Sequence, residues 1–365
     1  VDIDWNAFYE DSSARHISLP TYPFAKERYW LPEPDFKPER KSVKIEGLPS
    51  DAYKKVNEIF IGFKGALLKA TDASDQELPL IINQAMNEII DKSNAVVIEN
   101  PKIEPYIEES LVDIRPYCMG SAFCYRSFIK PFGYAGDFET MILIYENNPR
   151  GFTLLGKSVD EYLLSLPESQ SVRNRRTLMI NEFKNLFETT PKKEYLITAM
   201  ACGPAQEVFD LFENKEIKET ENVHITCIDI EERALAHVKN KAAESGIDGK
   251  IETLSANLFF AMDGDEDIDI PLQHLMYSVG FIDYLEDKEI IKFLNWIYTK
   301  LEPEGYAVLG NISTDTTLRL FLDYVLDWKL IYRTPQDLER IFTKSKFRGC
   351  EVIIDDTGCQ LFARA

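Results

Sequence analysis

Tyr195-Leu-Ile-Thr-Ala-Met-Ala-Cys-Gly-Pro-Ala-Gln-Glu-Val208 and Val223-His-Ile-Thr-Cys-Ile-Asp229 are the stretches that decide the fold. The first begins with an apolar run long enough for a buried strand, breaks at Cys202-Gly203-Pro204, and then has helical spacing. The second is another apolar run, and it ends on a single acid. A strand, a tight turn, a helix, a strand and an acid form half of a doubly wound sheet, which binds ligands at the carboxyl ends of its strands.

The turn after the first strand indicates which nucleoside ligand binds there. The dinucleotide fingerprint G-x-G-x-x-G is absent, because Gly203 stands alone with Pro204 beside it. A pyrophosphate needs close backbone approach over several glycines, so S-adenosylmethionine, an adenosine ligand without phosphates, fits this turn better. Asp229 follows Gly203 by 26 residues, where an acid can hold a ribose. The alternative is a βαβ unit whose turn is purely structural.

Length and charge exclude several classes of protein. The 365 residues, 45% of them hydrophobic, suffice for one large domain or two ordinary ones. The net charge of −20 argues against nucleic-acid binding and against anionic membrane surfaces. The six cysteines form no C-x-x-C pair, no apolar run approaches the roughly 18 residues of a membrane span, and no signal peptide opens the chain. We therefore expect a cytoplasmic protein with reduced thiols and no metal site.

Residues 1–31 are rich in proline and aromatic side chains. Ser18-Leu-Pro-Thr-Tyr-Pro-Phe-Ala-Lys-Glu-Arg-Tyr-Trp30 resembles the linker that follows ketosynthase domains in modular polyketide synthases. The resemblance implies a ketosynthase domain just upstream in the same chain, and the start at Val1 rather than Met predicts a fragment. A flexible aromatic-rich tail is the alternative. Residues 32–47, charged and proline-rich, are predicted to be a second linker.

The rest of the chain divides into a helical and a mixed part. Apolar residues recur at helical spacing over 51–69 and 76–92, and shorter helices follow, so residues 48–188 are predicted to form a helical lid or substrate subdomain. A separate docking domain is the alternative. Residues 189–365 predict five strands with crossover helices, further helices at about 315–327 and 335–344, and a terminal hairpin. We expect an α/β fold with the Rossmann-like doubly wound sheet of class I methyltransferases.

Six motifs carry a resemblance at the level of single residues. They are Lys130-Pro-Phe-Gly-Tyr-Ala-Gly-Asp137, Val172-Arg-Asn-Arg-Arg176, Ala201-Cys-Gly-Pro-Ala-Gln-Glu207, Tyr277-Ser-Val-Gly-Phe-Ile-Asp-Tyr-Leu285, Gly310-Asn311 and Asp327-Trp-Lys-Leu-Ile-Tyr-Arg333. Together they resemble a bacterial S-adenosylmethionine-dependent methyltransferase family that includes the O-methyltransferase domains of polyketide synthases. With the linker motif, this implies a domain of a polyketide module of the trans-acyltransferase kind. Its acceptor would be a hydroxyl or enol on a chain that phosphopantetheine tethers to an acyl carrier protein.

The expected cofactor contacts lie at the strand ends and in the lid. We expect Asp229 to take the ribose hydroxyls and Gly203 to let the backbone approach the methionine part. Arg173 or Arg126 would hold the cofactor carboxylate, although a solvated helix face is the alternative for the arginines at 173–176. Asn257 and Leu258 would frame the adenine, Ser278 would line the methionine side, and Asp137 would face the cofactor amino group. The full set of expected cofactor-binding residues is Tyr134, Asp137, Arg173, Ala201, Gly203, Asp229, Ile230, Asn257, Leu258 and Ser278.

The general base is predicted by elimination. The four histidines lie in the linker, at strand beginnings or on a helix face, namely His16, His224, His274 and His237. We therefore expect Asp283 to be the base, with Tyr284 or Tyr134 orienting the acceptor, and a helix cap is the alternative role of Asp283. Three alternatives stay open. One is α-carbon methylation of a β-ketoacyl chain, for which such domains usually use a His–Glu pair. The others are methylation of a carboxylate or oxime oxygen, and a domain that is an inactive scaffold.

Overall fold

The computed structural model describes residues 50–70, 72–215 and 217–365. The two linkers expected at 1–31 and 32–47 lie outside the described residues. Within the described ranges, no helix is long and apolar enough to cross a membrane. No group of three or more His, Cys, Asp or Glu side chains in these ranges is placed to hold a metal ion.

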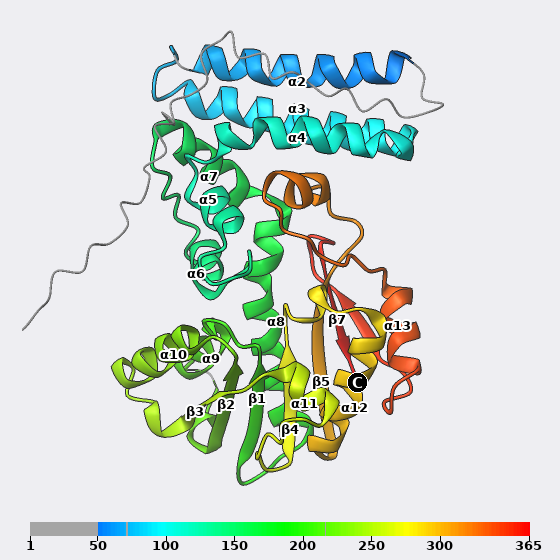
Figure 1. The fold of residues 1–365 in the computed structure, drawn as a ribbon. Helices are drawn as coiled ribbons and strands as arrows, with labels where there is room; N and C mark the ends of the chain where they lie inside the picture. The colour runs from blue at the N-terminus through cyan, green and yellow to red at the C-terminus, as the bar shows by residue number, and fades with distance from the viewer. Residues whose placement is uncertain (1–49, 71, 216) are drawn as a thin grey trace, which may run out of the picture. The chain divides into compact units, whose positions relative to one another are not determined.

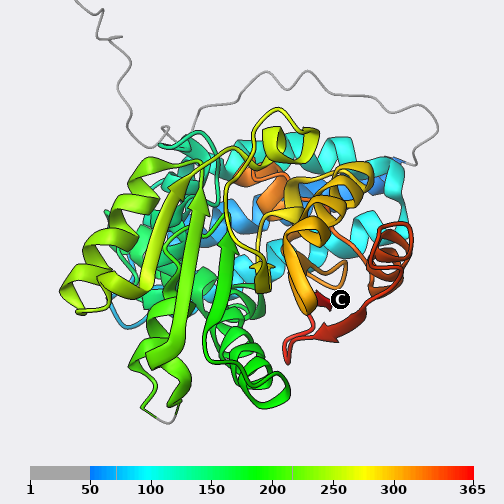
Figure 2. The same ribbon diagram turned by 90° about the horizontal axis from the view of Figure 1, so that it is seen from below.

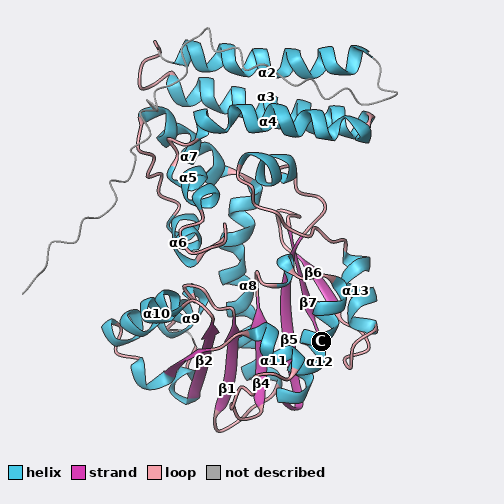
Figure 3. Cartoon of the chain, in the orientation of Figure 1, coloured by secondary structure: helices cyan, strands magenta, loops and turns pink. Residues whose placement is uncertain are grey.

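The described residues form a seven-stranded sheet (Figures 1 and 3). Its strands are β1 (Tyr195–Met200), β2 (Val223–Asp229), β3 (Ile251–Ser255), β4 (Gln273–Ser278), β5 (Leu301–Ile312), β6 (Glu351–Ile354) and β7 (Gln360–Arg364). The spatial order is β3-β2-β1-β4-β5-β7-β6, with β1 to β5 parallel and β7 antiparallel to both its neighbours. This is the class I methyltransferase sheet with its terminal antiparallel hairpin, so the predicted fold class is confirmed.

Helices cover both faces of this sheet, as the view in Figure 2 shows. One face carries α8 (Pro167–Thr189), α9 (Gln206–Glu213) and α10 (Glu232–Glu244), and the other carries α11 (Leu258–Asp263), α12 (Asp287–Lys300) and α13 (Pro335–Thr343). Phe183 and Phe209 belong to the first apolar layer, Ile290 and Phe293 to the second. Parallel strands need apolar cover on both sides, which explains why β1 and β2 are apolar almost throughout.

The helical part consists of α2 (Ser50–Ala70), α3 (Leu78–Glu99), α4 (Glu104–Cys118), α5 (Ala122–Ile129), α6 (Phe138–Glu146) and α7 (Leu154–Ser165), followed by α8. Figure 1 shows α2, α3 and α4 side by side, with α8 reaching from this part along the sheet. The hydrophobic core of the helical part also contains Leu318, Phe321 and Trp328, which follow β5 in the chain. The helices α2 to α7 therefore share their core with a segment that is far away in the chain.

The helix expected at 315–327 is shorter than predicted. Helical backbone begins only at residue 319, and its last five residues form the π-helical turn η5 (Phe321–Val325). The Glu168 carboxylate of α8 accepts hydrogen bonds from the backbone N–H groups of Thr317 and Leu318, at 3.0 and 3.2 Å. These bonds hold residues 315–318 outside the helix, and sequence spacing gives no sign of a partner so far away in the chain.

Candidate functional site

The Asp229 side chain joins the carboxyl ends of β1 and β2. Its Oδ2 accepts the Gly203 N–H at 2.8 Å, and its Oδ1 accepts the Glu231 N–H at 2.9 Å. Burial raises the pKa of Asp229, while the backbone hydrogen bonds act in the opposite direction. A carboxylate oxygen has two lone pairs, so both oxygens can still accept ribose hydroxyls. Ile230, the next residue, is exposed beside it.

The turn between β1 and α9 has an unusual backbone. Ala201, Gly203 and Ala205 all have left-handed φ angles, of +47°, +53° and +46°. A Cβ atom at Gly203 would meet nothing nearer than the Cβ of Phe138 at 4.0 Å, so the backbone angle rather than a lack of space favours glycine there. The single glycine was visible in the sequence, whereas nothing in the sequence indicates the two left-handed alanines.

Two further strand ends complete the predicted cofactor edge. Asn257 caps α11, since its Oδ1 accepts the Phe259 N–H at 3.0 Å, and Leu258 beside it is buried. Ser278 ends β4 and is 1% exposed, and its Oγ has no hydrogen-bond partner among the described residues. An unpaired buried hydroxyl is costly, so Ser278 is a group that a ligand could satisfy.

The loop at 130–137 is anchored by its last residue. Asp137 is fully buried and caps α6 through its Oδ1, which accepts the Thr140 N–H at 2.8 Å. Both of its carboxylate oxygens also accept from Arg126 Nη2, each at 3.0 Å. Asp137 and Arg126 are thus paired with each other, and a role of Asp137 toward the cofactor amino group stays a prediction.

The same loop packs against a tyrosine–tryptophan pair. Trp328 Nε1 donates to Tyr284 Oη at 2.9 Å, and a Cβ atom at Gly136 would lie 2.8 Å from both the Tyr284 Oη and the Trp328 ring. Tyr134 is half-buried, and its pKa is raised by burial and then by the charges of Asp229 and Asp137. Tyr134 thus lies within range of the Asp229 charge, and Tyr284 packs against the 130–137 loop and Trp328.

The three arginines at 173–176 point in different directions, because successive helical residues are turned by about 100°. Arg173 donates to the Leu164 carbonyl and the Gln170 side chain, both at 2.9 Å, and so bonds within the helical part. Arg176 forms a bidentate pair with Asp210 of α9. Arg175 lies at the sheet edge, within 4.0 Å of Asp283. The proposed carboxylate contact of Arg173 stays a prediction, and sequence reasoning missed Arg175.

Asp283 lies in a short turn, η4 (Ile282–Tyr284), directly beyond β4. Its Oδ1 accepts the Ile312 N–H at 2.6 Å, and burial raises its pKa while Arg175 lowers it. The helix-cap alternative is wrong, because the N-cap of α12 is Glu286, which forms a capping box with Glu289. Asp283 is therefore a buried carboxylate that is not used to start a helix.

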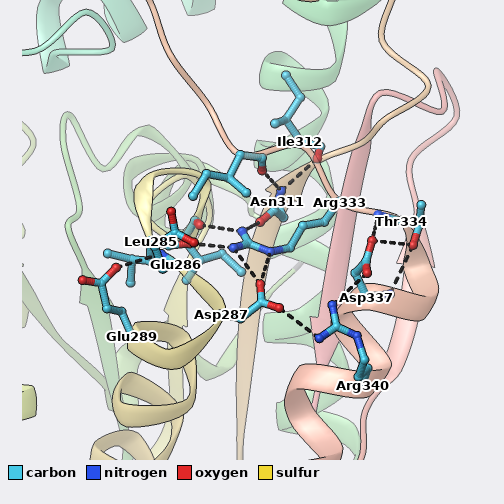
Figure 4. Close-up of polar contacts among 12 residues, drawn as sticks. Leu285, Glu286, Asp287, Glu289, Asn311, Ile312, Arg333, Thr334, Asp337 and Arg340 are labelled. Carbon is cyan, nitrogen blue, oxygen red and sulfur yellow. Dashed lines mark hydrogen bonds and ion pairs between the residues drawn. The ribbon is translucent and has the colours of Figure 1, made fainter.

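Arg333 holds this turn in place (Figure 4). It is 2% exposed and donates to the carbonyls of Ile282 and Leu285 at 3.0 and 2.6 Å. It also donates to Asn311 Oδ1 at 2.7 Å, and Asn311 Nδ2 in turn donates to the Ile331 carbonyl at 2.9 Å. One guanidinium thereby connects the η4 turn, the end of β5 and the segment that carries Trp328.

Comparisons with known proteins find short sequence matches and distant structural ones. No family model matches the chain. Polyketide synthase PksL of Bacillus subtilis is 54% identical over 39 residues, and PksN of the same organism is 55% identical over 31 residues. These stretches are 11% and 8% of this chain, and the chain matches about 1% of the length of each relative.

Among solved structures, a possible exported protein of Bordetella parapertussis aligns with a TM-score of 0.49 and 13% identity over 87% of this chain and 98% of its own. The magnesium protoporphyrin IX methyltransferase of Synechocystis, solved with bound S-adenosylmethionine, aligns with a TM-score of 0.38 and 9% identity, over 54% of this chain and 81% of its own. Likenesses this distant do not bear on function, and the fold assignment rests on the strand order.

Proposed function

We propose that this chain is an S-adenosylmethionine-dependent O-methyltransferase that acts on a hydroxyl of an acyl chain carried by an acyl carrier protein. The observation that carries the proposal is the bond from the Gly203 amide to the buried Asp229 carboxylate, at adjacent strand ends of a class I methyltransferase sheet. The short matches to polyketide synthases support an assembly-line setting, with a ketosynthase domain and the carrier protein as partners.

The residues at the strand ends fit the cofactor. Asp229 has lone pairs left for the two ribose hydroxyls, and the buried Ser278 hydroxyl lacks a partner within the part of the chain that the structure describes. Gly203 lets the backbone come close to the methionine part, and Leu258 offers an apolar surface for adenine. S-adenosylmethionine would supply an already activated methyl group, so the protein has mainly to orient the acceptor and remove its proton.

Asp283 is the proposed base. Asp283 Oδ2 would take the proton of the acceptor hydroxyl as its oxygen gains the methyl group, and the methyl–sulfur bond of the donor would break to leave a neutral thioether, S-adenosylhomocysteine. Burial raises the pKa of this carboxyl, which brings it nearer to the operating pH and makes it a better proton acceptor. Tyr284 and Tyr134 would flank the acceptor, and the loop at 130–137, seated on Trp328, would exclude water.

The test combines binding with mass analysis. Calorimetry should show S-adenosylmethionine binding to the wild-type chain and at least tenfold weaker binding to Asp229→Asn, while circular dichroism confirms that both are folded. A carrier protein loaded with a β-hydroxyacyl chain should gain the mass of one methylene, and one loaded with a β-ketoacyl chain should not. Gain on the β-keto chain alone would indicate carbon or enol methylation, and absent cofactor binding by a folded protein would indicate a scaffold.

A further inference from the structure

A buried arginine lies beside the proposed base. Arg175 of α8 is 9% exposed, and its Nη2 donates to Gln360 Oε1 at 2.7 Å, at the start of β7. Nη2 is also 4.0 Å from Asp283 Oδ2. A Cβ atom at Gly280 would lie 2.9 Å from Nη1, so a side chain at this position would force the guanidinium to shift.

Each member of this pair keeps one unused polar atom. Among the described residues, Arg175 Nη1 makes no hydrogen bond, and Asp283 Oδ2 has only the 4.0 Å ion pair, which is too long for a hydrogen bond. Arg175 can only donate and an ionised Asp283 can only accept. The site therefore presents one donor and one acceptor next to each other.

The hairpin and α8 hold this pair rigidly. Gln360 is 1% exposed, and its backbone N–H donates to Asp355 Oδ1 at 2.9 Å. Asn174, the residue before Arg175, donates to Asp355 Oδ2 at 3.0 Å. The turn of the β6–β7 hairpin thus bonds both to α8 and to the residue that fixes the Arg175 side chain, so the guanidinium is oriented before any acceptor binds.

We propose that Arg175 and Asp283 together bind and select a neutral acceptor with oxygens on carbons 1 and 3 of its chain, the carbonyl of a thioester and a β-hydroxyl. This inference rests on the proposed function and specifies its substrate. The carbonyl accepts from Arg175, and the hydroxyl donates to Asp283. Oxygens on carbons 1 and 3 of one chain can lie about one hydrogen-bond length apart. Both can therefore face the Arg175 guanidinium and Asp283 Oδ2, whose contact through Nη2 is 4.0 Å.

The same pair rejects two other acceptors. A β-ketoacyl chain in its keto form has two carbonyls, and one of them would face the Asp283 carboxylate without a proton to donate. A carboxylate acceptor would meet the negative charge of Asp283 directly, and the Arg175 charge is already balanced by that carboxylate. Donor and acceptor placement therefore favours the β-hydroxy thioester over the keto form of a β-ketoacyl chain and over a free carboxylate.

The experiment compares two pantetheine acceptors, a β-hydroxyacyl thioester and its analogue in which a methylene replaces the carbonyl. Wild type should show a kcat/KM ratio between them of about 10- to 100-fold, the range expected for a charge-assisted hydrogen bond. Arg175→Lys and Gly280→Ala should reduce this ratio toward one, the latter by displacing a retained arginine. Arg364→Lys is the matched control, because Arg364 lies at the far end of β7 and pairs with Glu351.

The outcomes separate the two levels of the proposal. Methylation of both acceptors with equal kcat/KM by wild type would overturn the role of Arg175 and leave the methyltransferase assignment standing. A ratio that persists in folded Gly280→Ala and Arg175→Lys would overturn it as well. If wild type methylates neither acceptor, the proposed function itself fails and the inference fails with it. Calorimetry with S-adenosylmethionine checks that each variant still folds and binds cofactor, and Gly280→Ala decides if Arg175→Lys does not fold.

Discussion

Replacing Arg333 should test whether one buried guanidinium holds the site together. Arg333→Lys removes donors from three acceptors, the carbonyls of Ile282 and Leu285 and the side chain of Asn311. Each acceptor left unpaired in the interior costs about 1–3 kcal/mol, and the lysine can satisfy one of the three. The bond to Asp287 adds little, because that carboxylate is 42% exposed. Two acceptors stay unpaired, so we expect the free energy of unfolding to fall by about 2–6 kcal/mol.

Urea denaturation followed by tryptophan fluorescence and circular dichroism measures this loss as a lower midpoint at an unchanged slope. The matched control is Arg340→Lys, since Arg340 pairs with the same Asp287 at 3.0 Å but is 47% exposed. Its effect should stay below about 1 kcal/mol. Equal effects of the two variants, or a loss below about 1 kcal/mol for Arg333→Lys, would refute the reasoning.

Four more predictions concern the site and its surroundings. Asp283→Asn should lower turnover by at least 100-fold with cofactor binding intact, and calorimetry with single-turnover mass analysis checks it; turnover within a few-fold of wild type would exclude Asp283 as the base. Burial raises the Asp283 pKa and Arg175 lowers it, so kcat/KM should fall as pH decreases through that raised pKa. Arg175→Gln should move this acid limb of the pH–rate profile to higher pH, and an unmoved limb would contradict the pairing of Arg175 with Asp283. The raised pKa of Asp283 also means that the folded chain binds its proton more tightly than the unfolded chain does. The contribution of Asp283 to stability therefore declines as pH rises from the ordinary carboxyl pKa through the raised one. In Asp283→Asn, denaturation midpoints measured over this pH range should decline less than in wild type. Gly136→Ala should destabilise the protein by about 1–3 kcal/mol, because the new Cβ would collide with Trp328 and Tyr284. It should also raise KM for the acceptor more than the dissociation constant of the cofactor. Denaturation and steady-state kinetics measure the two effects, and an unchanged KM would argue against a lid role for this loop.

Local sequence patterns sufficed for the sheet and its cofactor edge. Two apolar runs have the length of buried strands, and one ends in the Gly203 turn while the other ends on Asp229. This pattern predicts that both residues lie at adjacent carboxyl ends, and in the structure a hydrogen bond joins them. Helix 315–327 was overestimated for the opposite reason. Its start depends on Glu168, about 150 residues earlier in the chain, and a local window contains no information on such a partner.

The sequence by itself determined the fold class and the strand ends at which Gly203 and Asp229 lie, because these depend on periodicity and on residues that follow strands directly. Only the tertiary structure decided which arginine of 173–176 lies beside Asp283, since helical rotation directs Arg173 into the helical part and Arg175 toward Asp283. It also decided which side chains a Cβ atom at Gly136 or Gly280 would meet, because these side chains come from distant elements. Such roles follow from packing between elements that are far apart in the chain.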